Sequence, residues 1–181
     1  MQGTKQPQIR ISSGIYRGRK YSVSSGLRPT KSILREALFS MLEGKFEGGT
    51  FVDICSGTGC VAFEALSRGA EKAVLIEKDP RIFAASVSAA EKIGIEGAVF
   101  LNRECLSVLQ DSELFDDKVR VFYFDPPYDS KPEIHPGMEA FKRCKGALFI
   151  EEHRKGCAAV FKGEPFRTRT YGNSAITVFI I

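Results

Sequence analysis

The segment Asp125-Pro126-Pro127-Tyr128 follows an apolar run and has the residue types for chemistry on a flat amino group. Two consecutive prolines cannot continue a central strand, so they end it in a rigid loop. That loop can aim the Asp125 carboxylate and the Pro126 carbonyl at the two hydrogens of one NH2 group, while Tyr128 stacks on the base that carries it. Holding both hydrogens favours in-line attack of this weak nucleophile on a sulfonium methyl. A strand terminator with a core tyrosine is the simpler alternative.

A glycine-containing loop lies earlier in the chain, where residues 53–59 read Asp-Ile-Cys-Ser-Gly-Thr-Gly. Its backbone N–H groups and the helix that follows favour a nucleotide-like ligand. Residues 57–62 fit the dinucleotide pattern G-x-G-x-x-(G/A), and Glu77 stands 18 residues after Gly59, where a ribose-binding acid is expected. The loop alone leaves a nicotinamide cofactor and S-adenosylmethionine both open. Asp53 favours S-adenosylmethionine, whose ammonium group needs an anionic or carbonyl partner.

A third polar loop, Asn102-Arg103-Glu104-Cys105, follows another apolar strand. In a doubly wound sheet this loop flanks the adenine, so Glu104 could accept a hydrogen bond from the adenine amine, with Cys105 packed nearby. A solvated acid at the start of a helix explains Glu104 nearly as well.

Positive charge is concentrated at the N-terminus, although the net charge of the chain is only +4. Residues 1–35 contain eight basic residues and no acidic one, whereas the other 146 residues contain 18 basic and 22 acidic residues. A basic segment attached to a mildly acidic body is typical of an arm that binds a polyanion such as RNA. A solvated basic terminus is the alternative.

These loops must be positioned by alternating strands and helices, which predict an α/β fold with a mainly parallel, doubly wound sheet. We expect a basic arm and helix at 1–48 and one domain at 49–181. The arm should contain a small hairpin at 8–23 and a helix at 33–42 with Thr30 as its N-cap. Strands are expected at 51–55, 73–77, 98–102, 119–124 and 147–151, helices at 59–68, 80–93, 105–110 and 137–144, and a β-rich end at 158–162 and 175–181 with a hairpin across 172–173.

Composition excludes several other classes of protein. With 181 residues, 43% hydrophobic and 27% charged, the chain suits one globular domain rather than a disordered or coiled-coil protein. No apolar run approaches a membrane span, and residues 1–10 lack the apolar core of a signal peptide, so we expect a cytoplasmic protein and by default a monomer. The five cysteines and two histidines are not at metal-ligand spacing, so no metal is expected.

The combined motifs resemble a known family. Asp/Asn-Pro-Pro-Tyr/Phe after a fourth strand is the hallmark of amino methyltransferases that use S-adenosylmethionine, and the whole chain resembles the bacterial 16S rRNA guanine-N2 methyltransferase family (small-subunit methyltransferase D). The matching stretches outside the core motifs are 10–20, 27–30, 35–39 and 64–70. The chain departs from the family pattern at Cys55, where an aromatic residue is common, and at Glu104, where a shorter side chain is usual.

The resemblance implies a Rossmann-like methyltransferase fold and assigns roles to residues. Cofactor contacts would come from Asp53, Ser56, Gly57, Thr58, Gly59, Glu77 and Lys78, with Glu104 and Cys105 near the adenine. Residues 125–128 would hold the target guanine. Contacts to 16S rRNA within the small ribosomal subunit, or in an assembly intermediate, would come from Arg10, Arg17, Arg19, Lys20, Arg28, Thr30 and Arg35.

The expected reaction is direct methyl transfer to guanine N2, with no covalent enzyme intermediate because none of the five cysteines accompanies the Pro-Pro loop. A DNA adenine-N6 or cytosine-N4 methyltransferase is the nearest alternative, although the chain lacks a separate target-recognition domain. A protein-glutamine methyltransferase, a nicotinamide oxidoreductase and a non-catalytic ribosome-assembly factor are the others.

Overall fold

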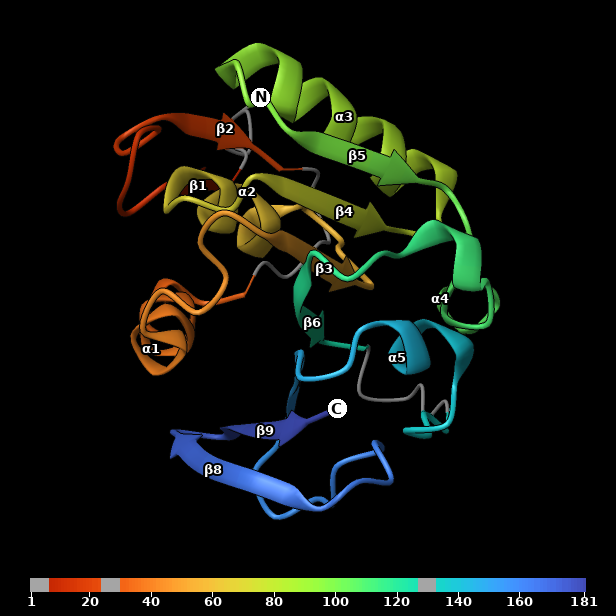
Figure 1. The fold of residues 1–181 in the computed structure, drawn as a ribbon. Helices are drawn as coiled ribbons and strands as arrows, with labels where there is room; N and C mark the ends of the chain where they lie inside the picture. The colour runs from red at the N-terminus through yellow and green to blue at the C-terminus, as the bar shows by residue number, and fades with distance from the viewer. Residues whose placement is uncertain (1–6, 24–29, 127–132) are drawn as a thin grey trace.

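The computed structural model describes residues 7–23, 30–126 and 133–181, which are built around a seven-stranded sheet (Figure 1). The strands lie in the order β5-β4-β3-β6-β7-β9-β8. The first five of these run parallel, while β9 pairs antiparallel with both β7 and β8. Their bounds are Thr50–Ile54 (β3), Lys72–Ile76 (β4), Ala98–Leu101 (β5), Val119–Phe124 (β6), Leu148–Arg154 (β7), Pro165–Tyr171 (β8) and Ser174–Ile180 (β9).

An apolar cluster covers each face of the sheet. The first contains buried side chains of α1 (Ser32–Leu42), α2 (Cys60–Ser67) and α3 (Pro80–Ile93), and the second contains those of α4 (Cys105–Leu109) and α5 (Glu139–Arg143). The central strands β3 and β6 are therefore buried on both faces, which is why they read as continuous apolar runs. From β3 the chain continues to β4 on one side of β3, and it later enters β6 on the other side. The switch point of the sheet therefore lies between β3 and β6.

The N-terminal arm forms a separate two-stranded hairpin of β1 (Gln8–Arg10) and β2 (Lys20–Ser22), as the sequence predicts. The buried side chains of Ile9, Ile11, Tyr16 and Tyr21 belong to the first apolar cluster. The hairpin therefore shares its core with α1 and α2. In Figure 1 it lies near α2 and α3, at the opposite end of the sheet from β8 and β9.

Most of the predicted elements are confirmed. Helix α3 has the expected bounds because Asp79 accepts hydrogen bonds from the N–H groups of Arg81 and Ile82, Pro80 occupies its first turn, and Gly94 ends it in the left-handed conformation. The expected hairpin across residues 172–173 also forms, between β8 and β9.

Two expectations are wrong. Residues 158–162 form no strand, and the hairpin partner of β9 is instead β8, seven residues of which six are exposed and one is half-buried. Thr30 does not cap α1, whose N-cap position is Lys31 with no side-chain capping bond. The Thr30 hydroxyl instead donates to Asp125, as described below.

Candidate functional site at the carboxyl edge of the sheet

The parallel strands end at one edge, and the predicted site residues follow these strand ends. The glycine loop follows β3, Glu77 follows β4, Glu104 comes soon after β5, and Asp125 follows β6 directly. Because the carboxyl ends of parallel strands lie together, the sheet brings these loops to one side of the molecule. Pro127, Tyr128 and Arg28 lie outside the described residues.

The glycine loop is a tight turn between β3 and α2. Gly59 has a φ of 73°, and a Cβ on it would lie 2.8 Å from the Phe63 ring and 3.0 Å from Leu75, so only glycine fits. The Ser56 N–H donates to the Ile76 carbonyl of β4 at 2.9 Å. The Ser56 hydroxyl is buried and has no hydrogen-bond partner among the described residues. A buried hydroxyl without a partner is costly, and it is expected where a ligand supplies the missing bond.

Glu77 joins the loops after β3 and β4. Its Oε2 accepts from the Gly57 N–H at 3.0 Å and its Oε1 accepts from the Asp79 N–H at 2.9 Å. The Asn102 side-chain amide, from the loop after β5, donates to the carbonyls of Glu77 at 2.8 Å and Lys78 at 3.2 Å. Glu77 thus lies beside the glycine loop and its ribose contact stays a prediction, while the Lys78 side chain is exposed.

Glu104 has a structural role that the sequence left open as an alternative. Its Oε2 accepts from the N–H groups of Leu106 at 2.7 Å and Ser107 at 3.2 Å, so it is the N-cap of α4. Its other carboxylate oxygen accepts from the Cys105 thiol at 3.2 Å. These bonds engage both oxygens and hold α4 at the edge of the site, with Cys105 buried beneath.

Asp53 is 2% exposed and lies within β3 rather than on a loop. Its Oδ2 accepts from the Ala62 N–H of α2 at 3.2 Å. Burial raises the pKa of this carboxyl well above its usual range, the Ala62 bond opposes the rise, and the charges of Asp125 and Glu77 add to it. A buried acid with neighbouring acids is stabilised by a bound cation, such as the ammonium group of an amino-acid ligand.

Asp125 lies at the end of β6 among groups that sequence reasoning missed. The Thr30 hydroxyl donates to Asp125 Oδ2 at 3.4 Å, and Glu152 of β7 accepts from the Tyr123 hydroxyl at 2.9 Å. Since Phe124 pairs with Glu151, Asp125 lies beside Glu152 on the neighbouring strand. Burial and then the Glu152 charge raise the pKa of Asp125 to about 8, while the Thr30 bond lowers it. Glu152 is one of two adjacent acids in the polar second half of β7, and no local signal in the sequence distinguishes it from Glu151.

The loops and side chains fit a nucleotide-like cationic cofactor. The Ser56 hydroxyl lacks a partner among the described residues, and a Cβ on Gly57 would meet only the Cys55 carbonyl, at 3.9 Å, so the outer side of the loop is open. Burial first, and then the charges of neighbouring acids, raise the pKa values of Asp53 and Asp125, so a bound cation would favour the ionised form of both carboxyls. S-adenosylmethionine has the amino-acid, sulfonium and ribose groups that these features call for.

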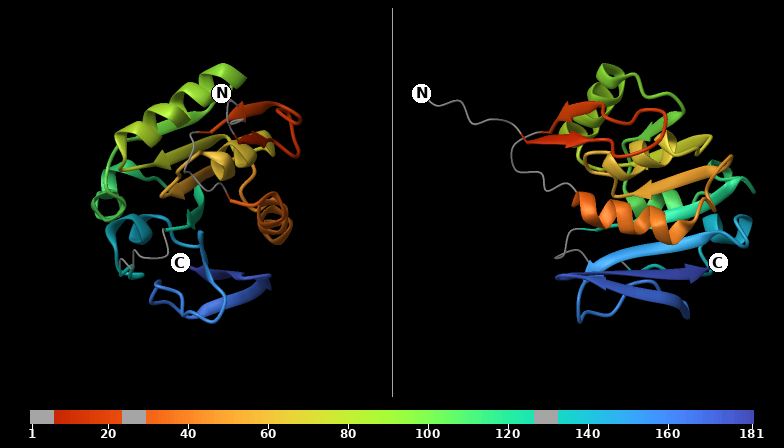
Figure 2. Two further views of the ribbon diagram at one scale, coloured as in Figure 1. Left: turned by 180° about the vertical axis from the view of Figure 1, so that it is seen from behind. Right: turned by 90° about the vertical axis from the view of Figure 1, so that its left-hand side faces the viewer.

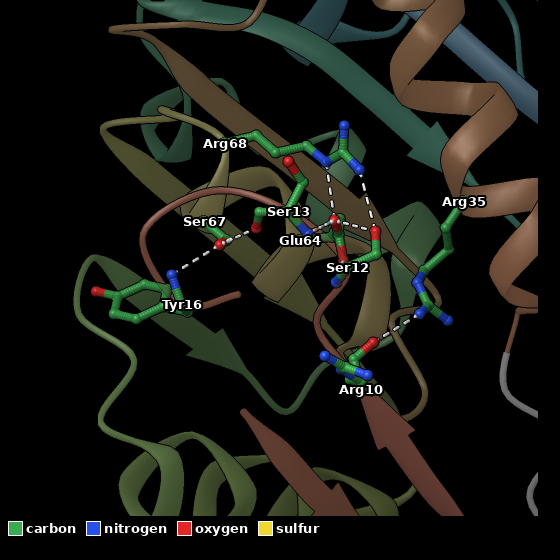
Figure 3. Close-up of polar contacts among 8 residues, drawn as sticks. All are labelled: Arg10, Ser12, Ser13, Tyr16, Arg35, Glu64, Ser67 and Arg68. Atoms are coloured by element: carbon green, nitrogen blue, oxygen red, sulfur yellow. Dashed lines mark hydrogen bonds and ion pairs between the residues drawn. The ribbon is translucent and has the colours of Figure 1, made fainter. Parts of the chain in front are cut away.

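The N-terminal arm is bound to α2 by a buried carboxylate (Figure 3). Glu64 is fully buried and accepts from the N–H groups of Ser12 and Ser13, from the Ser12 hydroxyl and from Arg68. The Ser67 hydroxyl accepts from the Tyr16 N–H at 3.0 Å. On its other side the arm contacts the site, because the Tyr21 hydroxyl donates to the Thr58 carbonyl of the glycine loop at 3.3 Å. The arm is thus an integral support of that loop.

Arg35 was expected to contact RNA, and the structure corrects this expectation. Its side chain is 4% exposed and donates to the carbonyls of Thr30 at 2.9 Å and Arg10 at 3.0 Å (Figure 3). The guanidinium links α1 to the arm, and its burial, with Nε left without a hydrogen-bond partner among the described residues, keeps it away from a phosphate. Thr30 was also expected to contact RNA, and its hydroxyl donates to Asp125.

Arg19 also makes contacts within the protein, but its side chain is exposed, so its role in RNA binding stays a prediction. Its guanidinium donates to the carbonyls of Ile93 and Gly94 and lies over the Tyr16 ring. These carbonyls end α3, which begins at the carboxyl edge and runs away from it for 14 residues, about 21 Å. Arg19 therefore stabilises a helix terminus far from the site. Arg10, Arg17 and Lys20 are exposed, and their role in RNA binding stays a prediction.

The chain matches known proteins along nearly its whole length. The family described as Conserved hypothetical protein 95 matches residues 9–180. The chain belongs to this family. Ribosomal RNA small subunit methyltransferase D from Haemophilus influenzae (strain ATCC 51907 / DSM 11121 / KW20 / Rd) is 34% identical over 128 residues, which cover 67% of this chain. The match spans 64% of that relative's own length, slightly less than two thirds. The resemblance inferred from the sequence is confirmed.

Solved structures confirm the fold. The putative methyltransferase yhhF from Escherichia coli is 27% identical with a TM-score of 0.72, over 95% of this chain and 97% of that one. A hypothetical protein from Thermus thermophilus is 28% identical with a TM-score of 0.77, over 96% of this chain and 99% of that one. More distant structures of this fold are named as methyltransferases that depend on S-adenosylmethionine. The Rossmann-like methyltransferase architecture is therefore shown.

Two further features were searched for in the part of the chain that the structure describes. No cluster of three or more His, Cys, Asp or Glu side chains is arranged to hold a metal ion there. No helix among the same residues is long and apolar enough to cross a membrane.

Proposed function

We propose that the protein transfers a methyl group from S-adenosylmethionine to the exocyclic N2 of a guanine in 16S rRNA, on small ribosomal subunits or their assembly intermediates. The observation that carries this proposal is Asp125, followed by Pro126, at the end of β6 beside the glycine loop. The relative named Ribosomal RNA small subunit methyltransferase D supports the rRNA substrate.

The cofactor would be held by residues of the first two loops. The N–H groups of residues 56–59 and the Ser56 hydroxyl suit its polar groups, Asp53 suits its ammonium, and Glu77 suits its ribose hydroxyls. When bound, S-adenosylmethionine supplies an electrophilic methyl group. Tyr21 and α4 hold the surrounding loops in place, so the chain binds this group with a preformed site.

The chain acts on the guanine by orienting N2 and by stabilising the charge that develops on it. The Asp125 carboxylate and the Pro126 carbonyl are two acceptors for the two N2 hydrogens, which directs the nitrogen lone pair away from them. N2 becomes acidic only as its new bond forms, so an early base is unnecessary and the Asp125 carboxylate can take the proton afterwards. Ionised Asp125 also stabilises the positive charge that develops on nitrogen.

The proposal is tested by transfer of labelled methyl from S-adenosylmethionine to undermodified small subunits, naked 16S rRNA and DNA, followed by nucleoside analysis. N2-methylguanosine formed on subunits or 16S rRNA is the expected product. N6-methyladenine in DNA would retain the chemistry and refute the substrate. No transfer to any of the three, despite cofactor binding, would refute the enzymatic role on nucleic acid.

The matched variant is Asp125→Ala. It should abolish transfer while leaving S-adenosylhomocysteine binding within about threefold, because the cofactor contacts come from the other loops. Binding is read from the ligand-induced rise in melting temperature. Retained turnover in this variant would remove Asp125 from the reaction.

A further inference from the structure

Basic residues gather at both ends of the chain and not only in the N-terminal arm. Residues 154–181 contain five basic residues and one acidic residue, whereas residues 36–153 contain 13 basic and 21 acidic residues. The C-terminal basic residues are Arg154, Lys155, Lys162, Arg167 and Arg169, all of them exposed. The β8–β9 hairpin and the end of β7 therefore form a basic surface attached to an acidic body.

The turn of this hairpin lies at the edge of the sheet that carries the site. Ser174, the first residue of β9, pairs with Arg154, the last residue of the parallel strand β7. The Lys155 N–H also donates to the Asn173 carbonyl in the turn at 2.9 Å. In Figure 2 the hairpin extends along one end of the sheet, as these pairings require. The hairpin turn and the end of β6 thus face the same side of the molecule.

Strand register also fixes the distance from the hairpin to Asp125. Arg169 pairs with Ile176 of β9, and Ile176 pairs with Glu152 of β7, so the three residues form one row across the sheet. Asp125 follows β6, the next strand along. Three strand spacings amount to about 14 Å, a distance that an RNA strand spans with a few nucleotides.

Arg167 and Arg169 project from the same face of β8, because side chains two residues apart in a strand share a face. Tyr171 lies on this face as well, and its hydroxyl donates to Met41 Sδ of α1 at 3.6 Å, so the face is the one that α1 covers. Neither arginine has a side-chain hydrogen bond or ion pair among the described residues, unlike Arg19 and Arg35 of the arm. Two free guanidinium groups about 7 Å apart are well placed to contact successive phosphates.

We propose that Arg167 and Arg169 of the β8–β9 hairpin form a second RNA-contact surface, which binds backbone phosphates of the strand that flanks the target base. This inference rests on the proposed function and identifies the surface that would hold the RNA next to the site. Charges on an edge strand can also serve to prevent strand pairing between molecules. RNA is favoured here because both arginines lie on one face of β8, and Arg169 lies in the row that leads to Glu152, the neighbour of Asp125.

The test compares the double variant Arg167→Gln/Arg169→Gln with a charge-matched control, Lys72→Gln/Lys118→Gln. Lys72 begins β4 and Lys118 precedes β6, so both exposed control residues lie at the opposite edge of the sheet. Filter binding to transcribed 16S rRNA between about 50 and 200 mM salt gives the slope of log Kd against log salt concentration. Methyl transfer to undermodified small subunits gives KM and kcat.

The hairpin variant should reduce the salt slope by about 1.4 to 1.8, the contribution of two phosphate contacts, and raise KM roughly tenfold. Its kcat, and its stabilisation by S-adenosylhomocysteine, should stay at the wild-type values. The control variant should keep the wild-type slope. A hairpin variant with the slope and KM of the control overturns the inference, and one that only self-associates in gel filtration assigns the arginines to edge protection.

Failure of the proposed function gives a different pattern. A wild-type protein that binds 16S rRNA through the hairpin without methylating it would refute the reaction and leave the RNA surface standing. Formation of N2-methylguanosine by the wild type and by the double hairpin variant at equal rates and with equal KM would refute the RNA surface and leave the reaction standing.

Discussion

The ionisation of Asp125 gives the sharpest test of the site geometry. Its pKa is raised to about 8, first by burial and then by the charge of Glu152, so about one tenth of the molecules carry an ionised Asp125 at pH 7 and about nine tenths at pH 9. Only the carboxylate accepts a hydrogen from the target amine without competition from its own proton. We therefore expect kcat/KM for the cofactor, measured well below saturation with RNA, to rise about tenfold between these pH values.

Two substitutions should move this titration in opposite directions. Glu152→Gln keeps an acceptor for the Tyr123 hydroxyl but removes the negative charge, so it should lower the pKa of Asp125. Thr30→Val keeps the shape of the side chain but removes the hydroxyl that donates to Asp125, so it should raise that pKa. Glu151→Gln is the control, because Glu151 points to the other face of β7 and accepts from the N–H groups of Val160 and Phe161.

The titration is read directly from the carboxyl 13C signal of Asp125 in the cofactor-free protein, assigned by its loss in Asp125→Asn. The other charged groups around it, Asp53 on β3 and Lys31 before α1, are unchanged in these variants. A wild-type midpoint near the ordinary value of about 4 would refute the reasoning. So would shifts of the same sign in the Glu152 and Thr30 variants.

Further expected outcomes concern stability and the arm. Because the folded-state pKa of Asp125 lies above its unfolded value, the wild type loses stability as pH rises from about 4 to about 8. Above pH 8, Asp125→Asn should therefore unfold at a higher temperature than the wild type, with a free energy of unfolding that is higher by about 1 to 5 kcal/mol. Glu64→Ala leaves the N–H groups of Ser12 and Ser13 without their acceptor and should lower the urea-unfolding free energy by about 2 to 4 kcal/mol; an unchanged midpoint would contradict the arm contacts. Gly14→Ala would place a Cβ 1.6 Å from the Ser67 carbonyl oxygen, so trypsin should cut the arm of this variant faster than that of Gly48→Ala, where the Cβ meets nothing within 4 Å.

The sequence predicted those elements whose signals are local. Helix α3 was predicted from end to end because its cap, its first-turn proline and its terminal glycine are all nearby in the chain. Strand β8 was missed because its residues are exposed or half-buried on both faces, so it shows no alternation of apolar and polar residues. The loops that carry Glu77 and Asp125 were located correctly, since a parallel sheet places its strand ends together, whereas Asp53 lies within β3.

Contacts between distant segments could not be predicted in the same way. Arg19 and Arg35 are basic residues in a basic segment, and nothing in their local sequence shows that backbone carbonyls from α3 and the arm occupy them. The link between Asp125 and Glu152 depends on the register of β6 against β7. Charge counted along a chain therefore indicates a partner class, but only the fold shows which charges are free to meet it.

Under the proposed function, one surface must bind both a cationic cofactor and an anionic RNA. Asp53, Glu77, Asp125 and Glu152 gather at the carboxyl edge, where a bound cation would favour the ionised forms of Asp53 and Asp125. We expect the RNA backbone to lie outside this edge, held by the exposed cations of the arm at one end of the sheet and of the β8–β9 hairpin at the other. A base can then reach Asp125 only by leaving its stack. The hairpin arginines and the Asp125 carboxylate should then act on different parts of the same nucleotide strand. Substitution of the arginines should change KM, and substitution of Asp125 should change kcat.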